Sequence, residues 1–343
     1  MKAVLLTEHG SVDKLQWVED CPTPEPGPGE ARVRVYAGSL NRLDLFVRQG
    51  WPGLNLSLPH ILGADAAGVI DALGEGIAGW AIGDRVAVDP TVSCGACGSC
   101  LSGQHNLCAH FGILGEDARG TNAEFVVVPA RNLIRLPEHV GYAEAAAAGL
   151  VYLTAWHSLI TRGGLRAGES VLVVGAGGGV NTASIQIAKF AGAKVYVVGS
   201  SDEKLEQARD LGADVLINRA KEDWSKIVYK LTDHQGVDVV VDNVGQATLF
   251  GSIRAVRKGG RILIVGNTSG PQFDLDLRYI FSKQISLIGS TMAPHGDYVT
   301  VMTLIFAGKI KPVIGARLPL EEIREAHQML ERGDVFGKIV LLS

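Results

Sequence analysis

The chain has 343 residues, which exceeds the length at which a single hydrophobic core usually keeps growing, so two domains are expected. Its composition, 47% hydrophobic and 20% charged, is that of a globular protein with an ample core. A net charge of -4 provides no general attraction for nucleic acid, and no stretch approaches the apolar length of a membrane span. The first apolar run ends after Leu6, too early for a signal peptide, so we expect a cytoplasmic protein with no nucleic-acid or membrane partner.

The first part of the chain has the sequence pattern of a small β-barrel. Short apolar segments are separated by Gly, Pro and Asp turns at frequent intervals, at residues 31–36, 67–72, 85–89 and 124–129. Such spacing is typical of short antiparallel strands. Within the helical segment expected after residue 41, Asp44 and Arg48 lie four apart and would pair on its surface.

Four cysteines lie within fifteen residues, Cys94, Cys97, Cys100 and Cys108, with the spacing C-x2-C-x2-C-x7-C. Four thiolates bind Zn²⁺ tetrahedrally and leave no position for water or substrate, so this pattern predicts one structural zinc per subunit. Two disulfides or unrelated reduced thiols are the alternatives, and three cysteines at successive three-residue steps disfavour both. Cys21 has no nearby partner and is read as a free thiol.

After about residue 147 strands alternate with helical patterns, which predicts a parallel sheet with crossover helices. We expect six strands, at residues 170–174, 194–198, 215–218, 237–242, 261–265 and 285–290. Helices are expected at about residues 181–191, 202–211, 224–231 and 246–256. Six strands make a complete dinucleotide-binding sheet.

A glycine-rich turn joins the first of these strands to its helix. Backbone N–H groups in such a turn approach a pyrophosphate at the helix N-terminus, whereas the alternative is a tight turn that merely needs glycine. Asn181 stands where the third glycine is usual, and it would cap the helix or bond the cofactor. The predicted phosphate-binding residues are Gly175, Ala176, Gly178, Gly179, Val180 and Asn181.

The end of the second strand decides which nicotinamide cofactor is preferred. An acidic side chain there would accept the ribose hydroxyls of NAD, but this strand ends at Gly199. Hydroxyls and cations that could receive a 2′-phosphate follow, which predicts NADP(H) over NAD(H); they are Ser200, Ser201, Lys204 and Arg219. Lys204 and Arg219 could equally be ordinary solvated charges. The predicted cofactor-binding set also includes Thr154, Asn243, Gly266 and Asn267.

The last predicted strand, at residues 285–290, is apolar and stands at the edge of the sheet. An exposed edge of this kind is a liability unless it is paired or covered. We expect it to pair with its own copy in a homodimer or homotetramer, the alternative being cover by the C-terminal residues of the same chain.

Together these segments resemble the medium-chain dehydrogenase/reductase superfamily, which includes zinc alcohol dehydrogenases and quinone oxidoreductases. The resemblance covers essentially the whole chain and is carried by GSLNRLDLFVRQG, PHILGADAAGVI, GDRV, the four-cysteine lobe, GTNAEFVVVP, LTAW and the terminal GKIVL. It implies an α/β architecture with a GroES-like β-barrel catalytic domain at residues 1–146 and 292–343. A doubly wound Rossmann nucleotide-binding domain would occupy residues 147–291, with the active site in the cleft.

The resemblance also shows that ligands of a catalytic zinc are missing from this chain. Zinc alcohol dehydrogenases hold a second, catalytic zinc with a Cys, the His of a GHE segment, and a third Cys, Asp or Glu. Here Asn41 stands at the Cys position and GHE reads Gly63-Ala64-Asp65. Neither Asn nor Ala replaces a thiolate or an imidazole, so a catalytic metal is not expected. The LNRLD segment is instead similar to the zinc-free quinone and enone reductases.

We therefore expect an NADP(H)-dependent reductase of small-molecule quinones or α,β-unsaturated carbonyls, enoyl thioesters included. Asn41 is the first catalytic candidate as a hydrogen-bond donor, followed by Tyr152 and His60 as proton donors. His60 is more often a structural histidine, and Asn41 could bond only local backbone. The alternatives are an alcohol dehydrogenase with divergent metal ligands at His60 or Asp65, and a nucleotide-binding redox sensor without turnover.

Overall fold

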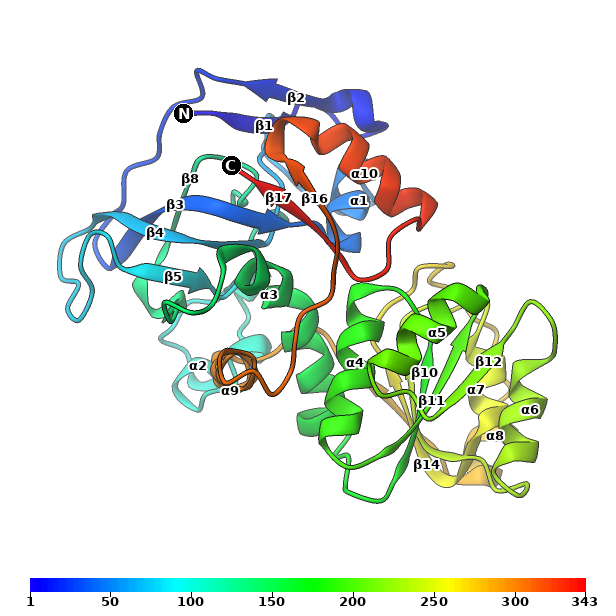
Figure 1. Ribbon diagram of the computed structural model, residues 1–343. Helices are drawn as coiled ribbons and strands as arrows, with labels where there is room; N and C mark the ends of the chain where they lie inside the picture. The colour runs from blue at the N-terminus through cyan, green and yellow to red at the C-terminus, as the bar shows by residue number, and fades with distance from the viewer. The chain divides into compact units, whose positions relative to one another are not determined.

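The computed structural model describes all 343 residues, and they divide into two compact units. The first unit comprises Met1–Leu153 and Ala293–Ser343, and the second comprises Thr154–Met292. The chain thus leaves the first unit and returns to it at its C-terminal end (Figure 1). No helix is long and apolar enough to cross a membrane.

The first unit is built on a seven-stranded sheet in the order β16-β17-β3-β4-β5-β9, with β8 paired to β3. Its long central strands are β3 (Glu30–Ser39) and β4 (Asp65–Leu73), joined to β5 (Arg85–Val88), β8 (Phe125–Pro129), β9 (Leu133–Arg135), β16 (Ile314–Pro319) and β17 (Lys338–Leu342). Two-stranded sheets pair β1 (Ala3–Leu6) with β2 (Leu15–Val18), and β6 (Thr91–Val92) with β7 (Gly112–Ile113). Most pairs are antiparallel, which confirms the GroES-like prediction.

The C-terminal segment completes this sheet, since β17 lies antiparallel to β3 although about 300 residues separate them (Figure 1). Alternate side chains of β3 and β4 are buried in one apolar core, and the C-terminal residues Leu318, Ile323 and Leu341 pack into another with Val4 and Leu6. The helices of this unit are α1 (Arg42–Gln49), α2 (Gly98–Leu101), α3 (Tyr142–Trp156), α9 (His295–Phe306) and α10 (Ile323–Arg332), and α3 runs on past Leu153.

The second unit is a six-stranded parallel sheet in the order β12-β11-β10-β13-β14-β15. This is the doubly wound order 3-2-1-4-5-6, with the reversal between β10 and β13. The strands are β10 (Ser170–Val174), β11 (Lys194–Gly199), β12 (Val215–Asn218), β13 (Val237–Asp242), β14 (Val256–Ile264) and β15 (Ser286–Gly289). The helices are α4 (Gly179–Phe190), α5 (Asp202–Asp210), α6 (Trp224–Leu231), α7 (Leu249–Ala255) and α8 (Leu277–Lys283).

The sheet is buried on both faces, which explains why its strands are nearly continuous apolar runs (Figure 1). β10, β12 and β13 have the predicted bounds, and the Rossmann prediction is confirmed. β14 begins at Val256, five residues before the prediction, because Val256 already pairs with Val237; the register then shifts, and Gly259 with φ +68° lies in the irregular stretch before Arg261. The first turn after β13 is not helical, so α7 begins only at Leu249.

Candidate functional site

The four cysteines converge in a loop of the first unit, around the short helix α2. Their sulfur atoms all lie within 4.8 Å of one another, and the Cys108–Cys94 and Cys97–Cys100 Sγ distances are 3.5 and 3.6 Å. Four sulfurs bonded tetrahedrally at about 2.3 Å would lie about 3.8 Å apart, so the geometry fits zinc and no pair is a disulfide. Backbone N–H groups of Ala96 and Cys97 lower the pKa of the Cys94 thiol to about 6, which favours the thiolate. The cluster supports a structural zinc.

The turn after β10 leaves its backbone open to a ligand. Gly175 has φ +119°, a backbone conformation that residues with a side chain rarely adopt. Helix α4 begins at Gly179, with Gly178 as its N-cap. Residues 177–180 are partly or fully exposed. This confirms a strand, an open glycine turn and a helix N-terminus in sequence, the arrangement that binds a pyrophosphate.

Asn181 does not cap the helix, so that alternative was wrong. It lies in the first turn of α4, buried, and its Oδ1 accepts a hydrogen bond of 2.8 Å from Asn243 Nδ2. A Cβ on Gly175 would come within 2.1 Å of Asn181 Nδ2, so the asparagine fills the space beside that glycine. The third glycine of the usual motif is thus replaced by a side chain that ties the turn to the end of β13.

Of the other predicted cofactor residues, Asn243 follows β13 directly, Gly266 and Asn267 follow β14, and Thr154 lies in α3. Gly266 adjoins Asn243, since an added Cβ would lie 3.0 Å from the Asn243 carbonyl oxygen. The carbonyl of Asn267 accepts from Gly270 N–H. Thr154 is buried, with Oγ1 3.7 Å from Met292 Sδ.

The end of β11 is tightly packed. Arg219 N–H donates to the Gly199 carbonyl at 2.8 Å, so the loops after β11 and β12 are adjacent, and the exposed Arg219 guanidinium makes no hydrogen bond or ion pair. Ser200 is exposed, and Ser201 Oγ caps α5 by accepting from Lys204 N–H. An added Cβ on Gly199 would lie 3.0 Å from Ala176 and Leu205, so this position does not accept a carboxylate without a shift.

The acidic residue that directly follows this loop, Asp202, is already paired. Asp202 accepts from Asn218 Nδ2 at 2.7 Å and forms an ion pair of 2.6 Å with Lys221, and these partners lower its pKa. It begins α5, as the sequence predicts.

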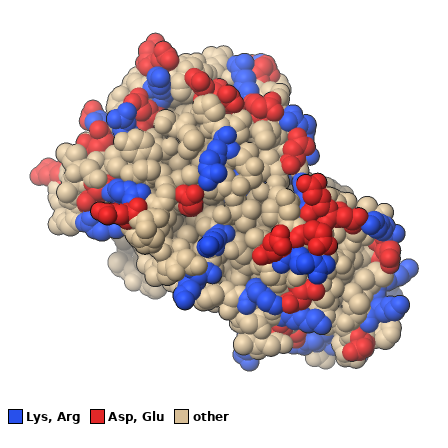
Figure 2. Space-filling view, in the orientation of Figure 1, with Lys and Arg blue, Asp and Glu red and all other residues tan.

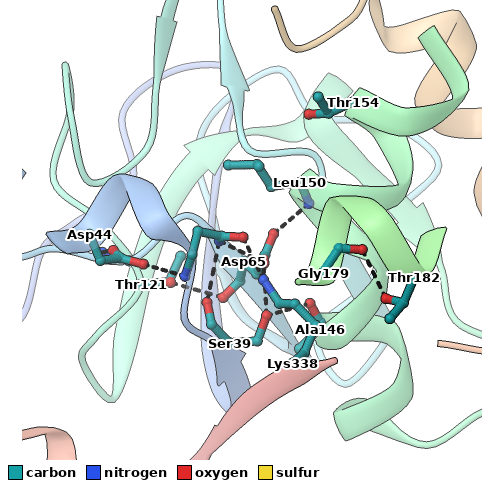
Figure 3. Close-up of polar contacts among 12 residues, drawn as sticks. Ser39, Asp44, Asp65, Thr121, Ala146, Leu150, Thr154, Gly179, Thr182 and Lys338 are labelled. Carbon is teal, nitrogen blue, oxygen red and sulfur yellow. Dashed lines mark hydrogen bonds and ion pairs between the residues drawn. The ribbon is translucent and has the colours of Figure 1, made fainter. Parts of the chain in front are cut away.

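In the first unit Asn41 belongs to a buried polar cluster, which we call the Asp65 cluster: Ser39, Asn41, Asp44, Asp65 and Lys338. Sheet register assembles it, because Ser39 on β3 pairs with Asp65 on β4 and with Val340 on β17. Lys338 is two residues before Val340, on the same face of its strand. Figure 3 shows Asp65 at the centre of these contacts.

Both oxygens of the Asp65 carboxylate accept hydrogen bonds, three at Oδ2 and one at Oδ1. Its Oδ2 accepts from Ser39 Oγ at 2.7 Å, Asn41 Nδ2 at 2.9 Å and Lys338 Nζ at 3.1 Å (Figure 3). Its Oδ1 accepts from the Leu150 N–H at 2.6 Å (Figure 3). A Cβ on Gly149 would collide with Oδ1 at 2.2 Å, so the glycine is required for α3 to approach so closely.

Asn41 uses both ends of its amide inside this cluster, since Oδ1 accepts from Lys338 Nζ while Nδ2 donates to Asp65. Its backbone N–H donates to Asp44 Oδ2 at 2.7 Å, and Gly63 N–H donates to Asp44 Oδ1 at 2.9 Å. Burial raises the pKa of Asp44 to about 6 against these hydrogen bonds and the nearby Lys338 charge.

The other two catalytic candidates lie apart from the Asp65 cluster's contacts. The buried Tyr152 hydroxyl donates to the Lys311 carbonyl at 3.1 Å. His60 Nε2 is 3.3 Å from the Gly115 carbonyl oxygen, and burial lowers the pKa of His60, so the neutral ring donates. Both contacts are structural, and a catalytic role for either residue stays a prediction.

The predicted surface pair of Asp44 and Arg48 is wrong, because both are buried and face different partners. Arg48 contacts Glu331 and the Gly10 carbonyl, and its Nη1 lies 3.5 Å from His327 Nδ1. Burial and the Arg48 charge lower the pKa of His327 to about 3. The pair was misassigned because α10, far along the chain, covers this face of α1.

Lys338 and Ser39 are the members of the cluster that residue patterns missed. Lys338 follows Gly337 in the terminal GKIVL segment, and a lysine at the start of a buried strand was the available signal. On the face shown in Figure 2, both signs of charge occur together, with Lys and Arg close to Asp and Glu.

Two protein families match this chain. The alcohol dehydrogenase GroES-like domain matches residues 27–138, and the zinc-binding dehydrogenase family matches residues 179–307. The chain belongs to the medium-chain dehydrogenase/reductase superfamily. It is an NAD(P)-dependent oxidoreductase of that superfamily.

Relatives of several activities resemble the chain over its full length. A crystal structure of an NAD-dependent alcohol dehydrogenase is 46% identical, with a TM-score of 0.96 and 100% of both chains covered. An acryloyl-coenzyme A reductase of Sulfurisphaera tokodaii is 33% identical, covering 99% of both chains. A human quinone oxidoreductase is 29% identical, covering 100% of this chain and 98% of its own. Relatives with different substrates therefore share the fold, and the residues of the site must distinguish among them.

Proposed function

We propose that this protein is an NADP(H)-dependent oxidoreductase that transfers hydride to quinones or α,β-unsaturated carbonyls, enoyl thioesters included, without a catalytic metal. The observation that carries the proposal is the Asp65 cluster. Asn41 and Ala64 stand where the zinc alcohol dehydrogenases that the chain resembles have Cys and His. The four cysteines of the lobe are the one group of three or more His, Cys, Asp or Glu side chains close enough to share an ion.

The residues at the Asp65 cluster do not fit a catalytic zinc. Such a site needs three protein ligands and one open position. The Asn41 amide is occupied by Lys338 and Asp65, and Ala64 has no ligand atom. Conjugated acceptors take hydride at a soft carbon and need less polarisation of their carbonyl, so they suit a site of this composition.

The residues of the second unit fit a nicotinamide dinucleotide, which supplies the hydride when it is bound. The exposed turn at residues 177–180 offers backbone N–H groups to the pyrophosphate at the N-terminus of α4. The Asn181–Asn243 hydrogen bond holds that turn against the end of β13. Gly175 keeps the backbone free of a Cβ that would strike Asn181.

The preference for NADP(H) rests on the loop after β11. No carboxylate stands at residues 199–201, and Asp202 is engaged by Lys221 and Asn218. Arg219, adjacent through its backbone bond to Gly199, has an unpaired guanidinium for a 2′-phosphate. The 46% identical alcohol dehydrogenase is described as NAD-dependent, so a direct comparison of the two cofactors is the deciding measurement.

A second candidate is an alcohol dehydrogenase, which the name of that 46% identical protein favours. The two candidates differ in metal content and in substrates. Purified protein is expected to contain one zinc per subunit, to consume NADPH with quinones or enones, and to oxidise primary alcohols poorly. A chelator that spares the cysteine lobe should leave this reduction nearly unchanged.

A different metal content and substrate range would contradict the proposed reductase. A second zinc per subunit, with alcohol oxidation that vanishes on chelation and returns with Zn²⁺, would replace the reductase with the alcohol dehydrogenase. Zinc bound at the cysteine lobe alone would not restore such activity, because a four-thiolate shell has no open position.

A further inference from the structure

His295, at the start of α9, is paired with the buried carboxylate of Asp89. His295 Nδ1 lies 2.8 Å from Asp89 Oδ2, and because a carboxylate only accepts hydrogen bonds, Nδ1 carries the proton of this bond. Asp89 is fully buried, and its Oδ1 accepts from the backbone N–H and the hydroxyl of Thr91 at 2.9 and 2.8 Å. Thr91 therefore fixes the carboxylate, and the carboxylate fixes the imidazole ring.

The register of the sheet places this pair beside the Asp65 cluster. Ala66 on β4 pairs with Val88 on β5. The next residues along the two strands, Asp65 and Asp89, therefore stand opposite one another. Opposite residues of antiparallel strands have Cα atoms about 4.5–5.5 Å apart. The carboxylate that binds His295 is thus the neighbour, across the sheet, of the carboxylate that binds Asn41.

Two buried polar atoms around the imidazole have no hydrogen-bond partner in the chain. They are the Tyr298 hydroxyl and His105 Nδ1, and the centroids of these two rings lie 6.2 and 6.4 Å from that of His295. Burial, together with the charges of Asp89 and Asp65, raises the pKa of Tyr298, so its hydroxyl stays protonated. A buried hydroxyl without a partner is costly, so this place suits a ligand that brings a hydrogen-bonding group.

We propose that His295 is the proton donor of the reduction, delivering the proton of Nε2 to the α-carbon of the acceptor, and that Asp89 is the positioning residue that directs this nitrogen to the substrate. The inference rests on the proposed function. Asp89 occupies Nδ1, and Nε2 makes no hydrogen bond within the chain. A carboxylate that binds one nitrogen of a histidine sets which nitrogen is presented to the substrate.

The proton completes the reduction of a conjugated acceptor. Hydride addition to the β-carbon of an enone or enoyl thioester leaves an enolate. The electron pair of the enolate then forms a C–H bond at the α-carbon with the proton of Nε2, and the product is the saturated carbonyl compound. His295 is left as a neutral imidazole with its Nδ1–H toward Asp89. Its side chain is 32% exposed, so water restores the proton.

His295→Asn separates proton donation from packing, because its Nδ2 stands at the position of Nδ1 and can still donate to Asp89. NADPH oxidation is followed with cyclohexenone and with benzoquinone as acceptors. A reduced quinone takes its protons on oxygen, where exchange with water is fast, whereas the enolate is protonated at carbon. We expect His295→Asn to lower kcat for cyclohexenone by about 100-fold or more and to leave benzoquinone reduction nearly unchanged.

Two further variants and one product analysis sharpen the test. Asp89→Asn should also slow cyclohexenone reduction selectively, because its amide offers Nδ1 a donor in place of an acceptor. His139→Asn is the matched control, since His139 Nε2 lies 2.9 Å from the Phe306 carbonyl oxygen at the other end of α9, and it should behave as the parent does. In deuterium oxide the parent should place deuterium on one face of the α-carbon, and His295→Asn on both faces, as measured by NMR of the product.

Equal loss of both reactions in His295→Asn would assign a structural role, and unchanged cyclohexenone reduction would exclude proton donation, so either result overturns the proposal. A parent that reduces benzoquinone alone keeps the proposed function and overturns the proton-donor role, because no carbon atom then takes a proton. A parent that reduces neither acceptor overturns the proposed function itself, and the proton-donor role with it.

Discussion

At the scale of single residues, several polar groups are buried where solvent cannot buffer a change of charge. His327 is the clearest case, because it is fully buried beside the Arg48 guanidinium and has a pKa lowered to about 3. A histidine that is neutral in the folded protein and titrates near 6.5 when unfolded adds stability above pH 6.5. That contribution is lost as the pH falls from 6.5 toward 3.

The free energy of unfolding should therefore drop by about 1.4 kcal/mol from this residue alone at pH 5.5 relative to neutral pH. Urea unfolding at pH 7.5 and pH 5.5 measures the loss, and His327→Phe should reduce it by that amount. The exposed His234, changed to Asn, serves as the control and should behave as the parent does. An unchanged pH dependence in His327→Phe would contradict the assignment.

Asn41 links the charged members of the Asp65 cluster, so its removal should affect activity more than folding. Asn41→Ala takes an acceptor from Lys338 and a donor from Asp65. We expect kcat/KM for quinone or enone reduction to fall by an amount equivalent to about 1–3 kcal/mol. Asn132→Ala removes another buried amide, bonded to the backbone of Asp89 and Thr91, and should reduce stability with little effect on kcat.

At the scale of elements, the cysteine lobe depends on its metal because it contains little regular structure besides the four residues of α2. Cys97→Ser should release the zinc and destabilise the lobe, since metal binding is coupled to local folding. Zinc content and resistance of the lobe to proteolysis are the measurements. Cys21→Ser, at a buried thiol in another cluster, should retain the zinc. A Cys97→Ser protein with full zinc and parental stability would refute the site.

We expect the loop after β11 to decide the choice between NADP(H) and NAD(H) through its charge. Ser200 is exposed beside Gly199, so Ser200→Asp introduces a carboxylate without the crowding that Gly199→Asp would meet. We expect a parental preference for NADPH that falls by about tenfold or more, because the carboxylate repels a 2′-phosphate and accepts ribose hydroxyls.

Arg219→Ala should weaken NADPH binding and leave NADH binding nearly unchanged. Lys258→Ala, an exposed lysine within β14, is the matched control for the loss of a surface charge. Titration of cofactor fluorescence gives both dissociation constants. Equal affinities of the parent for NADPH and NADH would remove the basis for this prediction.

At the scale of the whole molecule, one sheet edge is left open. β15 pairs only with β14, and the Arg162 guanidinium donates a hydrogen bond to the Gly289 carbonyl beside it. Beside it in sequence, α8 exposes Leu277 and Phe281 at 67% and 68%. Open strand edges and exposed apolar side chains together favour association.

We expect a homodimer or homotetramer assembled through β15 and α8, visible by sedimentation at micromolar concentration. Leu277→Glu/Phe281→Glu should dissociate it, since the charges would be buried without partners. Leu101→Glu, at an equally exposed leucine near the cysteine lobe, should not. A parental monomer would contradict this prediction.

The sequence pattern was sufficient to predict those features that depend on one short segment of the chain. The strands at residues 170–174, 215–218 and 237–242, the glycine turn after the first of them, and the cysteine spacing were all predicted from neighbouring residues. Periodicity and ligand spacing are properties of a few adjacent residues, so no distant contact is needed to read them. The absence of Cys and His at residues 41 and 64 was visible in the same way.

The Asp65 cluster required the tertiary structure. Ser39, Asp65 and Lys338 meet only because β3 pairs with β4 on one side and with β17, about 300 residues later, on the other. Arg48 was assigned to the surface because nothing in its own helix shows that α10 covers it. Sequence by itself determined most of the strands of the second unit and showed the missing ligands, although it misplaced the starts of β14 and α7. Only sheet register and helix packing, which depend on long-range contacts, decided which charge lies beside Asn41.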